Sequence, residues 1–111
     1  MRVSAVNKLG EGEFSGSKTL ETLTVLESSG INNVGDKAFY FCTMLRSVFI
    51  PESVTTVGKQ AFFGCEMLQS IILPNNISTI GDGTFCFCKK LQFVYIPESV
   101  ITIGDCYLMS N

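Results

Sequence analysis

The chain has 111 residues, of which 46% are hydrophobic, and its formal net charge is -2. It therefore has enough apolar material for a folded core, and its composition excludes a disordered tail. Because basic residues are few and histidine is absent, the sequence excludes an extensive phosphate-binding patch for nucleic acid, and it excludes Ser-His-Asp and Cys-His nucleophilic sites.

Signals for membrane insertion, export and cofactor binding are missing. No stretch approaches the roughly 20 consecutive apolar residues that cross a bilayer, and no apolar segment of a signal peptide follows Met1. Gly81-Asp82-Gly83 matches neither a dinucleotide-binding fingerprint nor a phosphate loop, because no further glycine or lysine follows at the required place. We expect no membrane segment, no nucleic-acid partner and no cofactor.

The sequence repeats itself every 23 residues. Glycine recurs at this step, and phenylalanine, cysteine and leucine follow each glycine at fixed offsets. These positions are Gly35, Gly58, Gly81 and Gly104; Phe39, Phe62 and Phe85; Cys42, Cys65 and Cys88; and Leu45, Leu68 and Leu91. A repeat of this length cannot bury its apolar face alone and must stack on its neighbours. We predict one repeat domain over residues 1–111, in which the glycines, phenylalanines and cysteines form structural ladders.

The repeats divide the chain into five parts. Residues 1–19 match the second half of a repeat, and residues 20–44 form a repeat with a two-residue insertion in the predicted loop at 26–30. Repeats without gaps follow at 45–67 and 68–90, and residues 91–111 form a partial repeat. We therefore expect about four to five repeats with open ends.

The first half of the repeat at 45–67 predicts two extended segments. Val48 and Ile50 alternate with outward positions, which is the period of a half-buried strand, and Pro51 ends that strand because it lacks an N–H. The β-branched run at 53–57 predicts a second short extended segment. Gly58 ends it, and we expect this glycine to adopt a backbone conformation that is costly for other residues.

The second half of the repeat predicts one or two turns of helix. Ala61, Phe62 and Cys65 recur at a spacing that suits a helix with one apolar side. In the other repeats an aspartate follows the glycine directly, where it can cap the helix and meet its positive end. These aspartates are Asp36, Asp82 and Asp105.

The string L-x-x-V-x-I-P-E-S-V-T-T-V-G-K-Q-A-F-F-G-C, which begins at Leu45, resembles the BspA-like, treponemal class of leucine-rich repeat, and the resemblance covers nearly all of the chain. It implies a right-handed α/β repeat solenoid with short strands on one face and short helical turns on the other. It also implies a setting in surface proteins of bacteria or parasitic protists and adhesion to host proteins or other cells. It supplies no catalytic residues.

Outward side chains of the predicted strands should form rows, because stacked coils bring equivalent positions to about 4.8 Å from each other. The candidate binding residues are the large side chains Phe49, Ile72, Tyr95 and Phe93, together with Arg46, Gln69 and Gln92 beside them. An exposed apolar stripe of this kind often marks an interaction surface. The alternative is that these side chains only stabilise the sheet through cross-strand contacts.

The cysteines fall into two groups by their place in the repeat. The ladder cysteines are expected to be buried as small hydrophobic residues, whereas Cys86 and Cys106 lie off the ladder and are expected to be exposed thiols. We expect no metal site, because no second ligand pair follows Cys86-Phe87-Cys88.

Asn76-Ile77-Ser78 has the acceptor pattern for N-glycosylation, which matters only if a eukaryote secretes the chain.

These patterns favour a non-enzymatic module that binds proteins, as a segment of an adhesin-type protein at the cell surface. The alternative is an intracellular scaffold or regulatory domain in the cytoplasm, where the environment keeps thiols reduced. Glu52 and Glu98 recur as surface residues of the repeat instead of meeting in a pocket, so no enzyme is expected. Neither end resembles a polar cap, which leaves three interpretations: a fragment of a longer array, a truncated gene model, or a chain whose uncapped coils are covered by end-to-end self-association.

Overall fold

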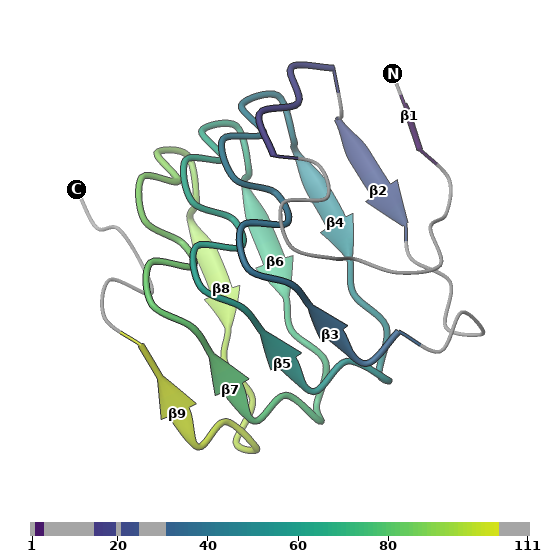
Figure 1. Cartoon of the computed structure of the whole chain (residues 1–111), viewed down its shortest axis with the longest axis vertical. Coiled ribbons are helices and arrows are strands. Elements are labelled where there is room, and N and C mark those ends of the chain that lie inside the picture. Colours follow the sequence, from purple (N-terminus) through teal and green to yellow (C-terminus); the bar gives the residue numbers. More distant parts are fainter. Residues whose placement is uncertain (1, 4–14, 20, 25–30, 105–111) are drawn as a thin grey trace.

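The computed structural model describes residues 2–3, 15–19, 21–24 and 31–104. Within this part the chain forms nine short strands on two sides of a coil (Figure 1). They are β1 (Arg2–Val3), β2 (Thr22–Thr24), β3 (Asn33–Val34), β4 (Ser47–Phe49), β5 (Thr56–Val57), β6 (Ser70–Ile72), β7 (Thr79–Ile80), β8 (Phe93–Tyr95) and β9 (Thr102–Ile103). The side formed by the even-numbered strands β2, β4, β6 and β8 is called the strand face below.

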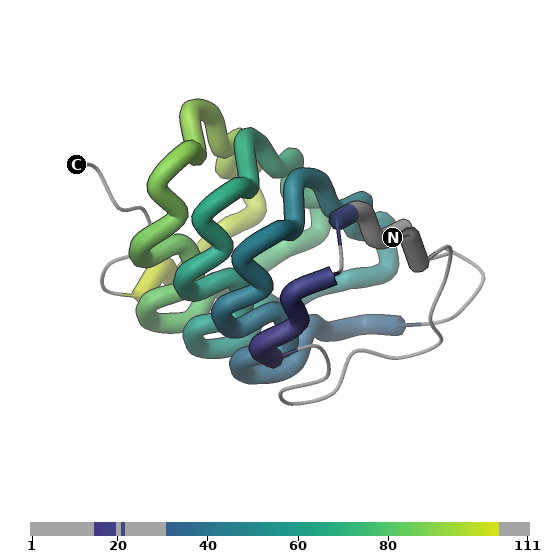
Figure 2. The backbone as a smooth tube through the Cα atoms, turned by 90° about the horizontal axis from the view of Figure 1, so that it is seen from above, coloured from purple at the N-terminus to yellow at the C-terminus, as the bar shows by residue number. Residues whose placement is uncertain are grey.

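All strand pairs are parallel and join one coil to the next. On the side opposite the strand face, β3, β5, β7 and β9 form one sheet in that order, and Thr56 pairs with Thr79, the equivalent residue one repeat later. Between β2 and β4 the step is longer by two residues, since Thr22 pairs with Ser47. Stacked coils with equivalent residues in register confirm the predicted repeat solenoid (Figure 2).

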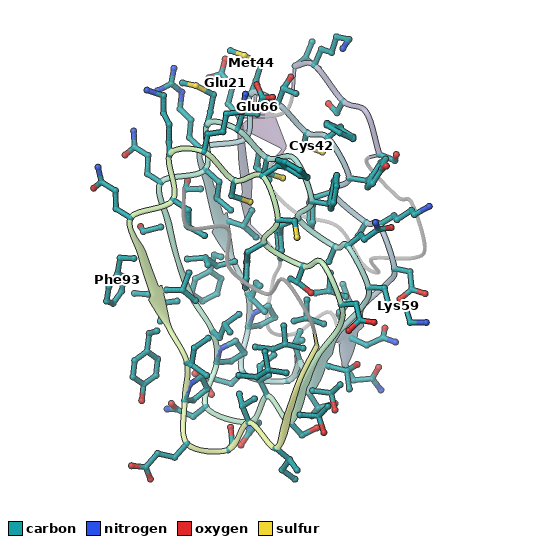
Figure 3. The ribbon with its side chains drawn as sticks, turned by 90° about the vertical axis from the view of Figure 1, so that its left-hand side faces the viewer. Glu21, Cys42, Met44, Lys59, Glu66 and Phe93 are labelled. Atoms are coloured by element: carbon teal, nitrogen blue, oxygen red, sulfur yellow. The ribbon has the colours of Figure 1, made fainter. Side chains whose placement is uncertain are left out.

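The two extended segments of each repeat lie where the sequence predicts them. Val48 and Ile50 are buried, whereas Ser47 and Phe49 are exposed, so the strand is half-buried as its alternation indicates. Figure 3 shows Phe93 of β8, which occupies the position of Ser47 two repeats later, with its side chain pointing away from the coil. The sequence did not predict β1, which pairs with β2 although residues 1–19 match only the second half of a repeat.

The predicted helical turns are not seen in the described residues, none of which lies in a helix. Each coil instead passes through successive turns, and two positions of these turns have a positive φ. One position holds Lys37 (56°), Gln60 (54°) and Gly83 (68°); the other holds Gly16 (75°), Phe41 (54°), Gly64 (75°) and Phe87 (60°). An α-helix requires right-handed residues throughout, so these positions stop it after a single turn.

Backbone hydrogen bonds of the turn segment run between coils instead of along a helix. The N–H groups of Lys37, Phe39 and Phe41 donate to carbonyls one coil further on, at 2.9, 2.7 and 2.7 Å. The intervening N–H groups of Ala38 and Tyr40 donate within the coil, to carbonyls three residues earlier. Every second residue of the turn segment therefore ties its coil to the next, as a strand does.

The predicted aspartate cap is also replaced by a contact between coils. Asp36 Oδ1 accepts a hydrogen bond from the N–H of Lys59, in the next coil, at 2.9 Å. There is no helix end to cap in this segment, so the carboxylate satisfies a backbone donor of the neighbouring coil. Asp105, the loop at 26–30 and Cys106 lie outside the described residues.

The glycine ladder is explained by close approach, which differs from the predicted reason. Gly58, Gly81 and Gly104 are not among the residues with a positive φ. A Cβ built on Gly81 would lie 2.6 Å from the backbone nitrogen of Lys59 and 2.7 Å from the carbonyl carbon of Gly58. Real Cβ atoms do not approach backbone this closely, so at this position only glycine lets successive coils pack together.

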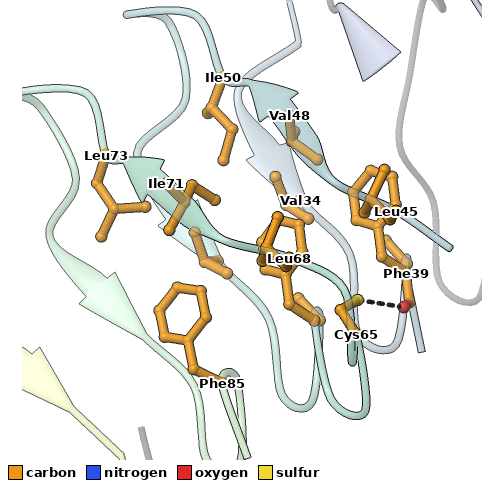
Figure 4. Packing of buried hydrophobic residues seen from close by; sticks show 14 of the residues in the cluster. Val34, Phe39, Leu45, Val48, Ile50, Cys65, Leu68, Ile71, Leu73 and Phe85 are labelled. Atoms are coloured by element: carbon orange, nitrogen blue, oxygen red, sulfur yellow. Dashed lines mark hydrogen bonds between the residues drawn. The ribbon is translucent and has the colours of Figure 1, made fainter. Parts of the chain in front are cut away.

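The core consists of ladders that run through the coils (Figure 4). Phe39, Phe62 and Phe85 are completely buried. The rings of Phe39 and Phe62 stack at 4.9 Å between centroids with 4° between planes, and those of Phe62 and Phe85 at 5.7 Å with 9°. The leucines Leu45 and Leu68 are fully buried as well. Buried side chains that are 23 residues apart in the sequence therefore stack on one another in successive coils.

Candidate functional site

The strand face carries four large apolar side chains in contact with solvent. Their exposed fractions are 52% for Phe49, 67% for Ile72, 54% for Phe93 and 44% for Tyr95. Phe49, Ile72 and Tyr95 occupy equivalent positions of β4, β6 and β8, and Ile72 pairs directly with Tyr95. Phe93 lies two residues before Tyr95 in β8. We call these four residues the apolar stripe. The structure thus brings the large candidate residues together on one face.

The strand face has a seam between β4 and β6. β1, β2 and β4 form one ladder, β6 and β8 form another, and no pairing joins the two, although β5 and β7 of the same coils are paired. Among the described strands of this face, the pairing is therefore interrupted once, between β4 and β6. At the seam lies an open groove of about 370 Å³, and its walls include Phe49, Ile72 and Pro74 with the serine side chains of both strands.

The amino ends of the strands carry the polar candidates. Arg46, Gln69 and Gln92 are exposed there, each one residue before its strand. A polar hollow brings Gln69 and Gln92 together with Lys89 and Lys90. The ammonium of Lys89 lies 3.9 Å from a carboxylate oxygen of Glu66, and both side chains are largely exposed. This end of the strand face therefore holds mixed charges.

The carboxyl ends of the strands are acidic. Glu52 and Glu98 are exposed, and the segments 50–55, 73–78 and 96–101, which leave the strand face, contain no lysine or arginine. Glu52 Oε1 accepts a hydrogen bond from the N–H of Asn75 at 3.2 Å, and Glu52 also lines the groove at the seam. These three described segments therefore place two carboxylates and no cation at the border of the apolar stripe.

The sequon residue Asn76 lies in one of these segments. Its side chain is exposed, and Nδ2 donates to the carbonyl of Glu52 at 3.1 Å. Ile77, the middle residue of the sequon, is completely buried. The asparagine is therefore at the surface, as a glycosylation acceptor requires, and its use stays a prediction.

A second group of aromatic side chains, which the sequence analysis missed, lies on the turn segments. Tyr40 and Phe63 stack with centroids 5.3 Å apart, and Phe63 contacts the edge of Phe87 at 5.3 Å. Phe41 and Phe87 are 38% and 47% exposed. Lys37 Nζ lies 5.1 Å from the centre of the Tyr40 ring. The period alone could have found this group, since aromatic residues recur five or six positions after the ladder glycines.

The ladder cysteines are buried, as predicted. Cys42, Cys65 and Cys88 have at most 1% of their surface exposed, and the thiols of Cys65 and Cys88 donate to the carbonyls of Phe39 and Phe62 at 3.2 and 3.1 Å. Burial raises the pKa of Cys42 to about 11 and that of Cys88 to about 12. Burial likewise raises the pKa of Cys65, and the other ladder thiols add to the shift.

Cys86 differs from its prediction. It is 5% exposed and disulfide-bonded, not an exposed thiol, and its partner lies outside the described residues. The prediction rested on its place off the cysteine ladder, but this place does not leave a side chain fully exposed, since Tyr40 and Phe63 at the equivalent position are half-buried. Among the described residues no cluster of histidine, cysteine, aspartate or glutamate could hold a metal ion.

The raised thiol pKa values predict a loss of stability at alkaline pH. The native state retains protons that the unfolded state releases above the ordinary pKa of 9.0, so this contribution is complete below pH 9 and falls as pH rises towards 11 or 12. At pH 10 each thiol should cost about 1.4 kcal/mol of unfolding free energy. Urea unfolding of the wild type and of Cys88→Ala at pH 7.5 and 10 checks this. The difference in unfolding free energy between the wild type and Cys88→Ala should be about 1.4 kcal/mol smaller at pH 10 than at pH 7.5. An unchanged difference would contradict the account.

The parallel stacked coils, the buried ladders and the single strand face define a leucine-rich repeat solenoid. The chain belongs to the BspA type leucine-rich repeat family: the family described as "BspA type Leucine rich repeat region" matches residues 3–111 in six copies. The resemblance in the repeat string is therefore confirmed. A search of curated proteins found no similar sequence.

Solved structures of bacterial repeat proteins share the fold. A leucine-rich repeat protein of T. pallidum is 26% identical, with a TM-score of 0.87, over 93% of this chain and 51% of that one. One from Bacteroides ovatus is 29% identical, with a TM-score of 0.68, over 91% and 32%. A leucine-rich cell surface protein from Faecalibacterium prausnitzii, 23% identical, has a TM-score of 0.64 over 97% and 38%. This chain spans about half or less of the length of these structures. In its described part no helix is long and apolar enough to cross a membrane.

Proposed function

We propose that the chain is a non-enzymatic, protein-binding segment of an adhesin-type surface protein and that it binds through the strand face. The observation that carries the proposal is the apolar stripe. Four large side chains remain between 44% and 67% exposed, whereas Val48 and Ile71 at inward positions of the same strands are buried. A contiguous exposed patch of this kind is typical of interaction surfaces.

The composition of the strand face supports a protein as the partner. Aromatic side chains are enriched in the centres of protein interfaces, and polar residues surround them. Here Phe49, Phe93 and Tyr95 provide the aromatic centre, and serine, glutamine and charged side chains border it. Cross-strand contacts bury only part of these side chains, and the exposed part is available to a partner.

The surface location is proposed from the relatives. One solved structure with this fold is described as a cell surface protein, and the family resemblance implies the same setting. Antibody labelling of intact cells tests this part. Labelling that appears only after permeabilisation would favour the intracellular scaffold instead.

Selection from a random peptide library displayed on phage tests the binding surface. We expect the wild type to enrich peptides from this library. These peptides should bind Phe49→Asp and Tyr95→Asp at least tenfold more weakly than they bind the wild type, and a tenfold change corresponds to about 1.4 kcal/mol of binding free energy. A charge in the apolar stripe leaves the core intact, so the thermal transitions should stay within a few degrees of the wild type.

Phe87→Asp serves as the matched control. Phe87 is 47% exposed, close to the 52% of Phe49, but it lies on the turn segment. Its positive φ of 60° suits aspartate better than phenylalanine, so the variant should fold. Selected peptides should bind it as tightly as the wild type. Equal affinity for Phe49→Asp, Tyr95→Asp and the wild type would overturn the proposed function.

A further inference from the structure

We infer that the partner segment is an extended polypeptide that places an apolar side chain in the groove at the seam and a basic side chain beside Glu52 or Glu98. This inference rests on the proposed function and specifies the chemistry of its partner. Three features of the strand face carry it: the groove, the apolar stripe and the uncompensated carboxylates.

The groove determines the apolar part of the ligand. It has a volume of about 370 Å³ and opens between β4 and β6, where the two strands do not pair. Phe49, Ile72 and Pro74 form apolar walls. A side chain of leucine or phenylalanine would bury its surface there, and the exposed edges of Phe93 and Tyr95 extend the apolar contact along the solenoid.

The carboxylates determine the charged part of the ligand. Glu52 lines the same groove, and Glu98 lies in the equivalent segment two coils further on. The segments that carry them contain no cation. Among the described basic residues, Lys37 and Lys59 lie in the turn segments after β3 and β5, and Arg46, Lys89 and Lys90 lie at the opposite, amino ends of the strands. A basic side chain of the partner would supply the missing positive charge. Such complementarity steers association and selects among partners.

The spacing between the two features sets the length of the motif. Phe49 and Glu52 are three residues apart, which corresponds to at most about 10 Å, because Glu52 lies in a turn beyond the end of β4. An extended ligand that lies along the strand direction would therefore need its apolar and basic residues about two to four positions apart. Tyr95 and Glu98 have the same three-residue spacing, so an extended ligand that lies along β8 would meet the same pair of features.

The peptides enriched by the wild type test the inference. We expect leucine, phenylalanine or a similar side chain to recur within two to four residues of lysine or arginine. One such peptide and its Lys→Glu or Arg→Glu counterpart should then be titrated against three proteins: the wild type, the double variant E52Q/E98Q and the double variant E52K/E98K. Glutamine keeps an oxygen that can accept from the N–H of Asn75, so E52Q removes the charge and retains that contact.

The basic peptide should bind E52Q/E98Q about tenfold more weakly than the wild type and E52K/E98K more weakly still. The acidic counterpart should regain affinity on E52K/E98K, and the affinity of the wild type for the basic peptide should fall as salt is raised. Rescue by the opposite charge distinguishes recognition from loss of folding.

Two results would overturn this inference and leave the proposed function intact. One is enrichment of apolar peptides without basic residues, and the other is equal affinity of all three proteins for the basic peptide. A concentration-dependent dimer in sedimentation that Phe49→Asp abolishes would identify a second copy of the chain as the occupant and would also overturn it. Binding that Phe49→Asp and Tyr95→Asp leave unchanged would instead defeat the proposed function itself.

Discussion

Replacing Gly81 with alanine is expected to lower the free energy of unfolding by at least about 2 kcal/mol. The new methyl group would lie 2.6 Å from the backbone nitrogen of Lys59 and 2.8 Å from its Cα. Both contacts are to backbone of the preceding coil, which cannot turn aside as a side chain can. The two coils must separate, and the hydrogen bond of 2.8 Å from Gly81 to Val57 weakens. Urea unfolding followed by circular dichroism measures the loss.

Gln60→Gly is the control for this glycine prediction. Gln60 has a φ of 54°, so glycine removes backbone strain at that position but makes the unfolded chain more flexible. These effects oppose one another, and the net change should stay within about 1 kcal/mol. If Gly81→Ala were as stable as the wild type, close approach would not be the reason for the glycine ladder.

Replacing Phe62 with alanine is expected to lower the free energy of unfolding by about 3 to 5 kcal/mol, the usual cost of truncating a buried phenylalanine. Phe62 is fully buried and stacks on a ring in each neighbouring coil. Its loss therefore weakens two interfaces between coils, and repeat proteins depend on such nearest-neighbour contacts. Differential scanning calorimetry should show a marked drop in the unfolding temperature.

Phe49→Ala provides the comparison for Phe62→Ala. The same chemical change at a side chain that is 52% exposed removes little buried surface and creates no closed cavity, so it should cost less than about 1 kcal/mol. Similar losses for the two variants would mean that the strand face contributes to the core, and the apolar stripe would then be a structural feature.

The repeat period predicted the strands, the buried ladders and the family, because all three depend on which residues recur on the inner side of a stacked coil. It could not predict the turn segment. Lys37, Gln60 and Phe41 adopt a positive φ without being glycine, and their local spacing also fits a helix. Gly83 and Gly64, which replace Gln60 and Phe41 at equivalent positions, were the signals that this segment turns repeatedly.

The candidate site was predictable in its residues but not in its shape. Alternation placed Phe49, Ile72 and Tyr95 on the outer side of their strands, where they lie. The seam could not be read from the sequence, since β4 and β6 follow the same 23-residue step as β6 and β8. Whether two neighbouring strands pair depends on small displacements between whole coils. These displacements cannot be predicted from the number of residues between equivalent positions.

The most direct test of the strand face as the binding surface is the pair of dissociation constants that Phe49→Asp and Phe87→Asp give with one selected peptide. The two side chains are similarly exposed and carry the same substitution, but they lie on different sides of the solenoid. We predict that Phe49→Asp weakens binding at least tenfold and that Phe87→Asp leaves the dissociation constant of the wild type unchanged. A loss of affinity confined to Phe87→Asp would place binding on the aromatic group of the turn segments and contradict the account.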